Sequence, residues 1–266
     1  MKESVCMENR PLIFISNDDG VFAKGINALI DIVRPFGDVF VVAPDEGHSG
    51  MSCAITSKIP IRATLLRSEA GLTVYSCTGT PVDCVKLALG NLLPRRPDLI
   101  LSGINHGSNS SVSVHYSGTM GITIEGALNN IPSIGFSLTT HSVDADFLGT
   151  ARFVKKIISF ALKNQLPNGV CLNVNIPDIA EIKGVKVCRQ TTGFWSEEFE
   201  ERIDPHQGTY YWLTGFLKNH EPEAEDTDEY ALSHGYISVV PCKIDITDYD
   251  FLKELAVSGK MHASLP

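Results

Sequence analysis

One short segment of the chain strongly limits what it can fold into. A continuous apolar run at residues 12–15 is followed by apolar side chains at helical spacing over residues 26–33, and then by a second apolar run at residues 39–43. Apolar runs this short are typical of buried strands. A strand, a helix and a strand in this succession form a βαβ unit, because parallel strands need a crossover connection. The segment therefore predicts a parallel sheet covered by helices.

The same alternation continues along the chain. Thr80 is predicted as the N-cap of a helix that has Pro81 at its first position. Residues 54–78 are rich in Ile, Thr and Val and are expected to form antiparallel strands. We expect further strands at residues 99–102, 132–137 and 170–174, the last closing the core, and helices after Thr119 and over residues 144–164. Together these elements predict an α/β fold with a Rossmann-like, mostly parallel sheet flanked by helices.

The character of the sequence changes after about residue 190. Both tryptophans, Trp195 and Trp212, lie there in strand-like pieces with other aromatic residues, beside the acidic loop 221–226. A strand at residues 237–240 and a short helix at residues 249–255 are expected to follow. Aromatic residues beyond a finished core are typical of a subunit contact, although packing over the core would also explain them. We interpret this part as a hairpin and helix extension for oligomerisation.

Length and charge exclude some classes of protein. A chain of 266 residues can bury a large core, and we expect one domain over residues 1–266, with a core at about 11–190 and an extension at about 191–266. The formal net charge of −9 argues against a groove for a nucleic-acid polymer, which needs clustered basic residues. A small anionic substrate remains compatible with this charge, because a bound cation can invert the local field.

The cysteines and the N-terminus predict the compartment. The seven cysteines are scattered, odd in number and free of any C-x-x-C pair, so neither a zinc site nor a disulfide framework is expected. The first ten residues are polar, and no apolar run reaches the length of a membrane span. We therefore expect a cytoplasmic protein with reduced cysteines and no membrane contact.

Three predicted strands end in polar loops, at residues 17–20, 45–52 and 102–109. Because the carboxyl ends of parallel strands meet at one edge of a sheet, these loops can converge on one crevice. Their carboxylate, hydroxyl and amide oxygens suit Mg²⁺ or Mn²⁺ better than zinc. The adjacent Asp18 and Asp19 repel each other when they are desolvated, and a divalent cation would offset that cost. A turn that caps the following helix is the alternative interpretation.

A second feature lies between residues 107 and 119, where Gly and Ser residues precede a predicted helix. Backbone N–H groups and hydroxyls at the start of a helix favour an anion. A divalent cation beside an anion site indicates phosphoryl chemistry. Taken singly, Ser49 is better explained as a loop hydroxyl, and Asn105 as an amide that hydrogen-bonds within its own loop.

Seven motifs occur in a fixed order along the chain. They are SNDDG at 16–20, VAPDEGHSG at 42–50, GTPVDCV at 79–85, SGINHGSN at 102–109, YSGT at 116–119, EGALNNIPSIGFS at 125–137 and TDEYALSHGYISVVP at 227–241. Each motif alone is weak, since NDDG occurs in many turns. Together and in this order they closely resemble the survival protein E (SurE) family of metal-dependent 5'/3'-nucleotidases.

The resemblance implies roles for individual residues. One Mg²⁺ or Mn²⁺ per subunit would be held by Asp18, Asp19, Ser49 and Asn105, the two aspartates being catalytic. The phosphate would be contacted by Asn17, Asn109, Ser117, Gly118 and Thr119. Two departures from the family pattern occur. His48 stands where the family often has arginine, and Met120–Thr123 is bulkier than the small residues usual after YSGT, so substrate contacts are expected to differ there.

The resemblance also implies a function and an assembly. We expect a phosphomonoesterase that hydrolyses nucleoside 5'- or 3'-monophosphates, as a homodimer or homotetramer that exchanges its C-terminal segment. A nucleotide-binding module without catalysis is the alternative. A phosphoacceptor signalling domain also places paired acids after its first strand. It further needs an aspartate and a lysine at later strand ends, where this chain has Asn105 and Ser137.

Overall fold

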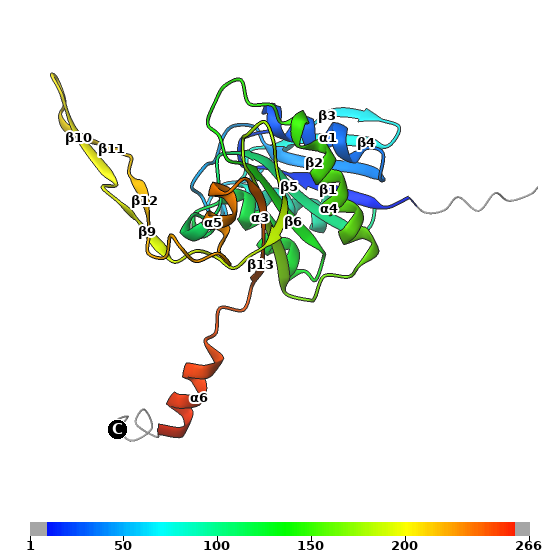
Figure 1. The fold of residues 1–266 in the computed structure, drawn as a ribbon. Coiled ribbons are helices and arrows are strands. Elements are labelled where there is room, and N and C mark those ends of the chain that lie inside the picture. The colour runs from blue at the N-terminus through cyan, green and yellow to red at the C-terminus, as the bar shows by residue number, and fades with distance from the viewer. Residues whose placement is uncertain (1–9, 259–266) are drawn as a thin grey trace, which may run out of the picture.

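Nine strands form one sheet whose central part is parallel (Figure 1). The computed structural model describes residues 10–258, so Cys6 and the rest of the polar segment 1–9 lie outside the described residues. The strands of this sheet are β1 (Leu12–Ser16), β2 (Asp38–Pro44), β3 (Ala63–Glu69), β4 (Leu72–Cys77), β5 (Leu99–His106), β6 (Ser133–Leu138), β7 (Val170–Ile176), β8 (Gly184–Val187) and β13 (Tyr236–Lys243). Their order is β3-β4-β2-β1-β5-β6-β7-β13-β8. Neighbours from β4 to β7 pair in parallel, whereas β3 and β13 join antiparallel to β4 and β7.

Helices cover both faces of the sheet. They are α1 (Lys24–Val33), α2 (Pro81–Leu87), α3 (Gly118–Leu128) and α4 (Ala151–Lys163). Two further helices, the short α5 (Asp228–Ser233) and α6 (Tyr249–Ser258), lie near the C-terminus. On one face α1 packs against α4, and on the other α2 packs against α3. Ile13 and Ile15 of β1 enter the first layer, and Leu12 and Phe14 the second. Burial on both faces explains why residues 12–15 of β1 are all apolar. The predicted α/β class is confirmed.

The start of α2 follows the sequence prediction. Thr80 is the N-cap, and its Oγ1 accepts a hydrogen bond from Asp83 N at 3.1 Å, while Asp83 Oδ2 accepts one from Thr80 N at 2.9 Å. Pro81 occupies the first helical position. This reciprocal pair is a capping box, which satisfies two backbone donors that a helix start otherwise leaves unpaired. The helix continues as a short π-helical turn, η1 (Ala88–Leu92).

Two predictions about the sheet were wrong. The strand at residues 170–174 does not close the core, because β13 pairs with β7 on its far side and β8 pairs in turn with β13. The loop expected at residues 102–109 begins later, because β5 runs on to His106 through an irregularity between Ser102 and Asn105. Gly103 makes this continuation possible: its φ is +109°, and a Cβ there would lie 2.2 Å from Phe136 O.

Two further predictions needed correction in their extent. The antiparallel strands expected within residues 54–78 exist as β3 and β4, but β4 also pairs in parallel with β2 and so belongs to the main sheet. The helix expected from residue 144 begins only at Ala151, after a 3₁₀ turn at Leu148–Thr150. Asp146 Oδ1 accepts a hydrogen bond from Gly149 N at 3.0 Å, so the preceding residues form a turn instead.

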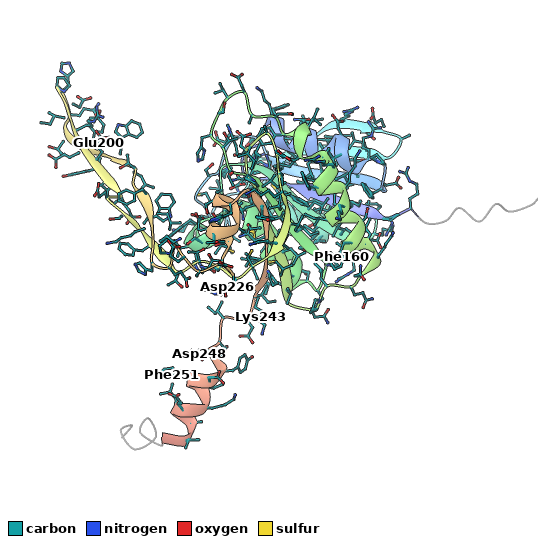
Figure 2. All side chains as sticks on the ribbon, viewed as in Figure 1. Phe160, Glu200, Asp226, Lys243, Asp248 and Phe251 are labelled. Atoms are coloured by element: carbon teal, nitrogen blue, oxygen red, sulfur yellow. The ribbon has the colours of Figure 1, made fainter. Side chains whose placement is uncertain are left out.

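Residues 193–219 form an arm that projects from the body of the molecule (Figure 1). It consists of two antiparallel pairs, which are β9 (Gly193–Ser196) with β12 (Phe216–Asn219) and β10 (Phe199–Asp204) with β11 (Gly208–Leu213). Phe199 and Ile203 are exposed on it, and α6 also stands away from the sheet (Figure 2). The predicted hairpin and terminal helix are therefore present. Within residues 10–258 every helix is too short or too polar to cross a membrane.

Candidate active site

The candidate site lies where the strand order reverses. The chain passes from β1 to β2 on one side and returns later to β5 on the other, so the carboxyl end of β1 borders two loops that diverge. Such a switch point leaves a crevice between neighbouring loops in open α/β sheets. Asn17, Asp18, Asp19 and Gly20 directly follow β1 at this point. The predicted convergence of strand-end loops is present here.

Asp18 is buried against the first turn of α3. It is 3% exposed, and its Oδ1 accepts a hydrogen bond from Thr119 Oγ1 at 2.5 Å. Burial raises the pKa of this carboxyl, and the bond from Thr119 together with backbone N–H groups at the start of α3 opposes that rise. A Cβ on Gly118 would lie 2.7 Å from Asp18 Cβ, so only glycine lets the helix come this close.

Asp19 lies beside Asp18 and faces the end of β5. Its Oδ2 accepts a hydrogen bond from His106 N at 3.2 Å. Burial, followed by the charge of Asp18, raises the pKa of Asp19 to about 6. Two desolvated carboxylates next to each other carry a free-energy cost that a cation would remove.

The loop after β2 meets the acidic pair through its backbone. His48 N donates a hydrogen bond to Asp18 O at 2.7 Å, and a Cβ on Gly20 would lie 3.3 Å from Glu46 C. Ser49 follows directly and is exposed, and none of the hydrogen bonds within residues 10–258 uses its side chain. Ser49 is therefore one residue away from a backbone contact with Asp18, and its exposed hydroxyl is available to a ligand.

Asn105 and Asn17 supply amide oxygens at the same edge. Asn105 is 8% exposed, and its Nδ2 donates to Gly107 O at 2.8 Å, so the donor is held within its own loop. Asn17 Nδ2 likewise donates to Gly20 O at 2.9 Å. Asn17 Oδ1 is buried and has no hydrogen-bond partner among the described residues. A buried oxygen left unpaired is costly and is typical of a site that binds a ligand.

The donors at this edge fit a hard divalent cation. They are carboxylate, amide and hydroxyl oxygens, which Mg²⁺ and Mn²⁺ prefer. Groups of three or more His, Cys, Asp or Glu able to hold a metal do not occur within residues 10–258. The predicted set of two carboxylates, one amide and one hydroxyl includes only two residues of those four types. The raised pKa values of Asp18 and Asp19 indicate that a positive charge would stabilise both carboxylates.

The predicted phosphate residues divide into two groups. Ser117 caps α3, its Oγ accepting a hydrogen bond from Met120 N at 3.0 Å, and Gly118 and Thr119 follow it against Asp18. Asn109 lies further away, at the ends of β6 and β7. Its Nδ2 donates to Ser137 Oγ at 2.8 Å, and none of its hydrogen bonds reaches Asp18 or Asp19.

Two supporting asparagines were missed by the sequence reasoning. Asn175 Oδ1 accepts a hydrogen bond from Asn109 N at 2.8 Å, and Asn173 Nδ2 donates to Asn109 O at 2.8 Å. Asn173 and Asn175 alternate with apolar residues in β7 and are 2% and 0% exposed. Polar side chains at alternate positions of a core strand share one face. This pattern in the sequence could have indicated that Asn173 and Asn175 support the site. Glu125 of α3, the first residue of the motif at 125–137, pairs with Lys86 of α2 at 2.9 Å.

Comparison with known proteins identifies the family. The family model described as "Survival protein SurE" matches residues 13–197, which is more than half of the chain. The chain belongs to the SurE family. It is 55% identical over 248 residues to a protein of Phocaeicola vulgatus named 5'-nucleotidase SurE, covering 93% of this chain and 96% of that protein. A protein of the same name from Chlorobaculum tepidum is 40% identical over 252 residues, covering 94% and 95%.

A solved structure supports the same assignment. The SurE protein from Aquifex aeolicus superimposes with a TM-score of 0.78 at 36% identity, covering 92% of this chain and 98% of that one. The match therefore includes the parallel sheet and most of the C-terminal part. The expected family and fold are confirmed.

Proposed function

We propose that this protein is a 5'-nucleotidase, a phosphomonoesterase that releases phosphate from nucleoside 5'- or 3'-monophosphates with the help of one Mg²⁺ or Mn²⁺ per subunit. The relatives named 5'-nucleotidase SurE support the reaction class. The observation that carries the proposal is the pair of desolvated carboxylates at the switch point, packed against the first turn of α3. A cation site next to a helix N-terminus suits a phosphate monoester.

Four residues would hold the cation: Asp18, Asp19, Ser49 and Asn105. A bound divalent cation supplies Lewis acidity to a phosphoryl oxygen and to the attacking water. Thr119 donates its hydroxyl hydrogen to Asp18 and so orients that carboxylate. His106 N does the same for Asp19. The bond from His106 leaves Oδ1 of Asp19 for the cation.

The phosphate would lie against the start of α3. Ser117 accepts the bond from Met120 N with its Oγ, so its O–H remains available as a donor. The other proposed phosphate contacts are Asn17, Asn109 and the first backbone N–H groups of α3, which begin at Gly118. Donors fixed before the reaction stabilise charge that develops on the phosphoryl oxygens.

Phosphate release from a panel of nucleoside 5'- and 3'-monophosphates tests the proposal. We expect release with Mg²⁺ or Mn²⁺ and none with EDTA, because the carboxylates need the cation to act. Saturable binding of a monophosphate without release would favour the alternative, a nucleotide-binding module without catalysis. Absence of both binding and release would contradict the proposal.

We also propose that the protein is a cytoplasmic homodimer or homotetramer that exchanges its C-terminal segment. The arm supports this, because exposed large apolar side chains gather on it away from the body (Figure 2). They are Phe199, Ile203, Tyr210, Tyr211, Trp212, Leu213 and Phe216. Apolar surface of this kind is typical of a contact between subunits.

A further inference from the structure

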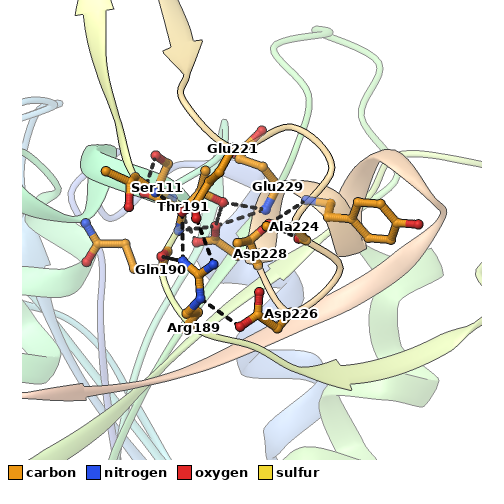
Figure 3. A network of polar contacts seen from close by, with 12 residues as sticks. Ser111, Arg189, Gln190, Thr191, Glu221, Ala224, Asp226, Asp228 and Glu229 are labelled. Carbon is orange, nitrogen blue, oxygen red and sulfur yellow. Dashed lines mark hydrogen bonds and ion pairs between the residues drawn. The ribbon is translucent and has the colours of Figure 1, made fainter.

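A buried aspartate, Asp228, joins the base of the arm to the segment that follows β5 (Figure 3). It is the first residue of α5 and is 1% exposed. Its Oδ1 accepts hydrogen bonds from Thr191 N at 2.9 Å, Thr191 Oγ1 at 2.6 Å and Glu229 N at 2.9 Å. Its Oδ2 accepts one from Ser111 N at 2.8 Å. The two oxygens of one carboxylate therefore bind two separate parts of the chain.

The Oδ1 side of Asp228 is part of a rigid junction. Thr191 lies two residues before β9. Arg189, on the segment that enters the arm, binds the segment that leaves it (Figure 3). Arg189 donates to both oxygens of Glu221 at 2.7 Å and to Asp226 Oδ2 at 2.8 Å. A bidentate guanidinium pair of this kind fixes direction as well as distance. Asp228 is thus attached to a part of the molecule that resists displacement.

The Oδ2 side of Asp228 holds a residue in an uncommon conformation. Ser111 has a φ of +52°, a left-handed conformation that few side chains other than glycine adopt readily. It is fully buried, and besides the bond to Asp228 its Oγ donates to Thr191 O at 2.9 Å. The neighbouring Ser110 donates from its Oγ to Glu229 Oε1. A backbone in this conformation persists only when surrounding bonds fix it.

The segment thus held contains Asn109, which is two residues before Ser111. On its other side Asn109 is fixed by Asn175 Oδ1 and Asn173 Nδ2 of β7, both at 2.8 Å. Residues 109–111 are therefore anchored at one end to the core sheet and at the other to Asp228. Loss of the Asp228 anchor would leave Asn109 held from the β6 and β7 side only, and the residues that follow it less fixed.

We propose that Asp228 is a positioning residue for the phosphate end of the active site, holding Asn109 in place through Ser111. This inference rests on the proposed function, which assigns Asn109 to the substrate phosphate. We expect Asn109, which has no hydrogen bond to Asp18 or Asp19, to contact the phosphate group in the bound substrate as well as in the transition state. Loss of its position therefore weakens binding more than it slows the chemical step.

The substitution Asp228→Asn separates the two connections. The single carbonyl oxygen of asparagine can still accept the bonds from Thr191 and Glu229. Its NH₂ group would then face Ser111 N–H, and two donors cannot bond to each other. The variant therefore keeps the junction of the arm and removes the bond from Ser111 N, while the bonds from Ser111 Oγ to Thr191 O and from Ser110 Oγ to Glu229 remain. Asp226→Asn is the matched control, because Asp226 binds Arg189 on the exposed side of the same junction and contacts neither Ser111 nor Ser110.

The experiment compares steady-state kinetics and inorganic-phosphate binding in wild type, Asp228→Asn and Asp226→Asn, all loaded with Mn²⁺. We expect Asp228→Asn to raise KM for the nucleotide and Kd for inorganic phosphate by about tenfold, with kcat within about threefold of wild type. Amide hydrogen exchange at residues 109–113 should become faster in the same variant. Asp226→Asn should leave all of these values unchanged.

Each outcome decides the inference. Unchanged KM, phosphate Kd and exchange in folded Asp228→Asn would overturn it and leave the proposed function intact. A wild type that releases no phosphate would overturn the proposed function, and calorimetric binding of inorganic phosphate by the same variants would then decide the inference. Where Asp228→Asn does not fold, Ser110→Ala loosens the same segment by removing the bonds of that hydroxyl to Glu229 and to Ser108. A rise in KM in that variant supports the positioning role, and an unchanged KM overturns it.

Discussion

At the scale of single residues, Asp19 is the most informative side chain of the site. Replacement by asparagine keeps its size and removes one of two adjacent charges. We expect Asp19→Asn to lower metal-dependent phosphate release by about 100-fold or more, because the cation loses a charged ligand. Thermal unfolding should show an intact fold. Asp45→Asn, at an exposed acid just after β2, is the matched control and should keep wild-type activity. Full activity of Asp19→Asn at saturating metal would contradict the assignment.

The raised pKa of Asp19 predicts how stability depends on pH in the metal-free protein. The value in the folded chain is about 6, against an ordinary value of 3.8. The folded state therefore binds this proton more tightly than the unfolded state, so the contribution favours folding below pH 3.8 and is lost as pH rises to about 6. The loss amounts to about 1–3 kcal/mol.

Thermal melts of metal-free wild type and Asp19→Asn between pH 4 and pH 8 measure this loss. As pH rises to about 6, the unfolding free energy of the wild type should fall relative to that of Asp19→Asn. Above that pH the difference between the two proteins should stay constant. Added Mg²⁺ should remove the difference at pH 8, since the cation neutralises the pair. Curves that remain parallel over the whole range would contradict the raised pKa.

The proximity of the candidate site residues could be predicted from the sequence for a physical reason. Asp18, Asp19 and Asn105 belong to strand ends that a parallel sheet must bring to one edge, and turn residues mark those ends. Ser111 and Asp228 are 117 residues apart in sequence. Their bond could not be predicted from the sequence, because no local pattern connects a helix start in the C-terminal part to a turn after β5.

At the scale of elements, the first turn of α3 sets the geometry of the site. Gly118 allows this turn to touch Asp18, and a Cβ there would lie 2.7 Å from Asp18 Cβ and 2.8 Å from its Oδ2. We expect Gly118→Ala to lower activity by about 100-fold, because either the carboxylate or the helix must move. Activity assays at saturating metal measure the effect.

Gly90→Ala provides the control for that substitution. Gly90 lies in the π-helical turn after α2, is exposed and has no atom within 4 Å of a built Cβ. We expect Gly90→Ala to keep wild-type activity and to match or raise the melting temperature, because alanine is favoured over glycine in helical conformations. Equal activity of the two alanine variants would contradict the importance of the close approach at Gly118.

The ends of elements were harder to predict than their existence. The apolar run of β5 ends at Leu101, yet the strand continues through Ser102 to His106. Its continuation depends on Gly103, whose backbone crosses close to Phe136 O of β6. That contact involves another strand, so the local sequence could only indicate a loop. As a result Asn105 lies on a strand and not in a flexible turn.

At the scale of the whole molecule, the arm tests the proposed assembly. Replacement of residues 199–213 by a short Gly-Ser linker removes β10 and β11 without touching any strand of the main sheet. We expect the mass in solution, measured by light scattering, to fall from that of a dimer or tetramer toward a monomer. The melting temperature of the remaining body should report an intact sheet. An unchanged mass would contradict a role of these two strands in assembly.

The overall architecture could be predicted from the sequence except at its C-terminal edge. Strands β1, β2, β5, β6 and β7 follow from apolar runs separated by helices, which allow only parallel pairing. The position of β13 does not follow, because an antiparallel neighbour of β7 can arrive from any later part of the chain. Its apolar run, Ile237 to Val240, was recognised as a strand, but only the structure places it next to β7.

This placement of β13 has a consequence for how the chain is made. β8 leaves the ribosome well before β13, yet in the finished sheet it is joined only to β13. The outer edge of β7 therefore stays open while the arm is synthesised, and β8 waits without a partner. Unpaired strand edges of this kind attract other chains. A messenger that ends before the codon for Tyr236 would leave both edges exposed, so such truncated products should aggregate even though most of the active site has already been translated.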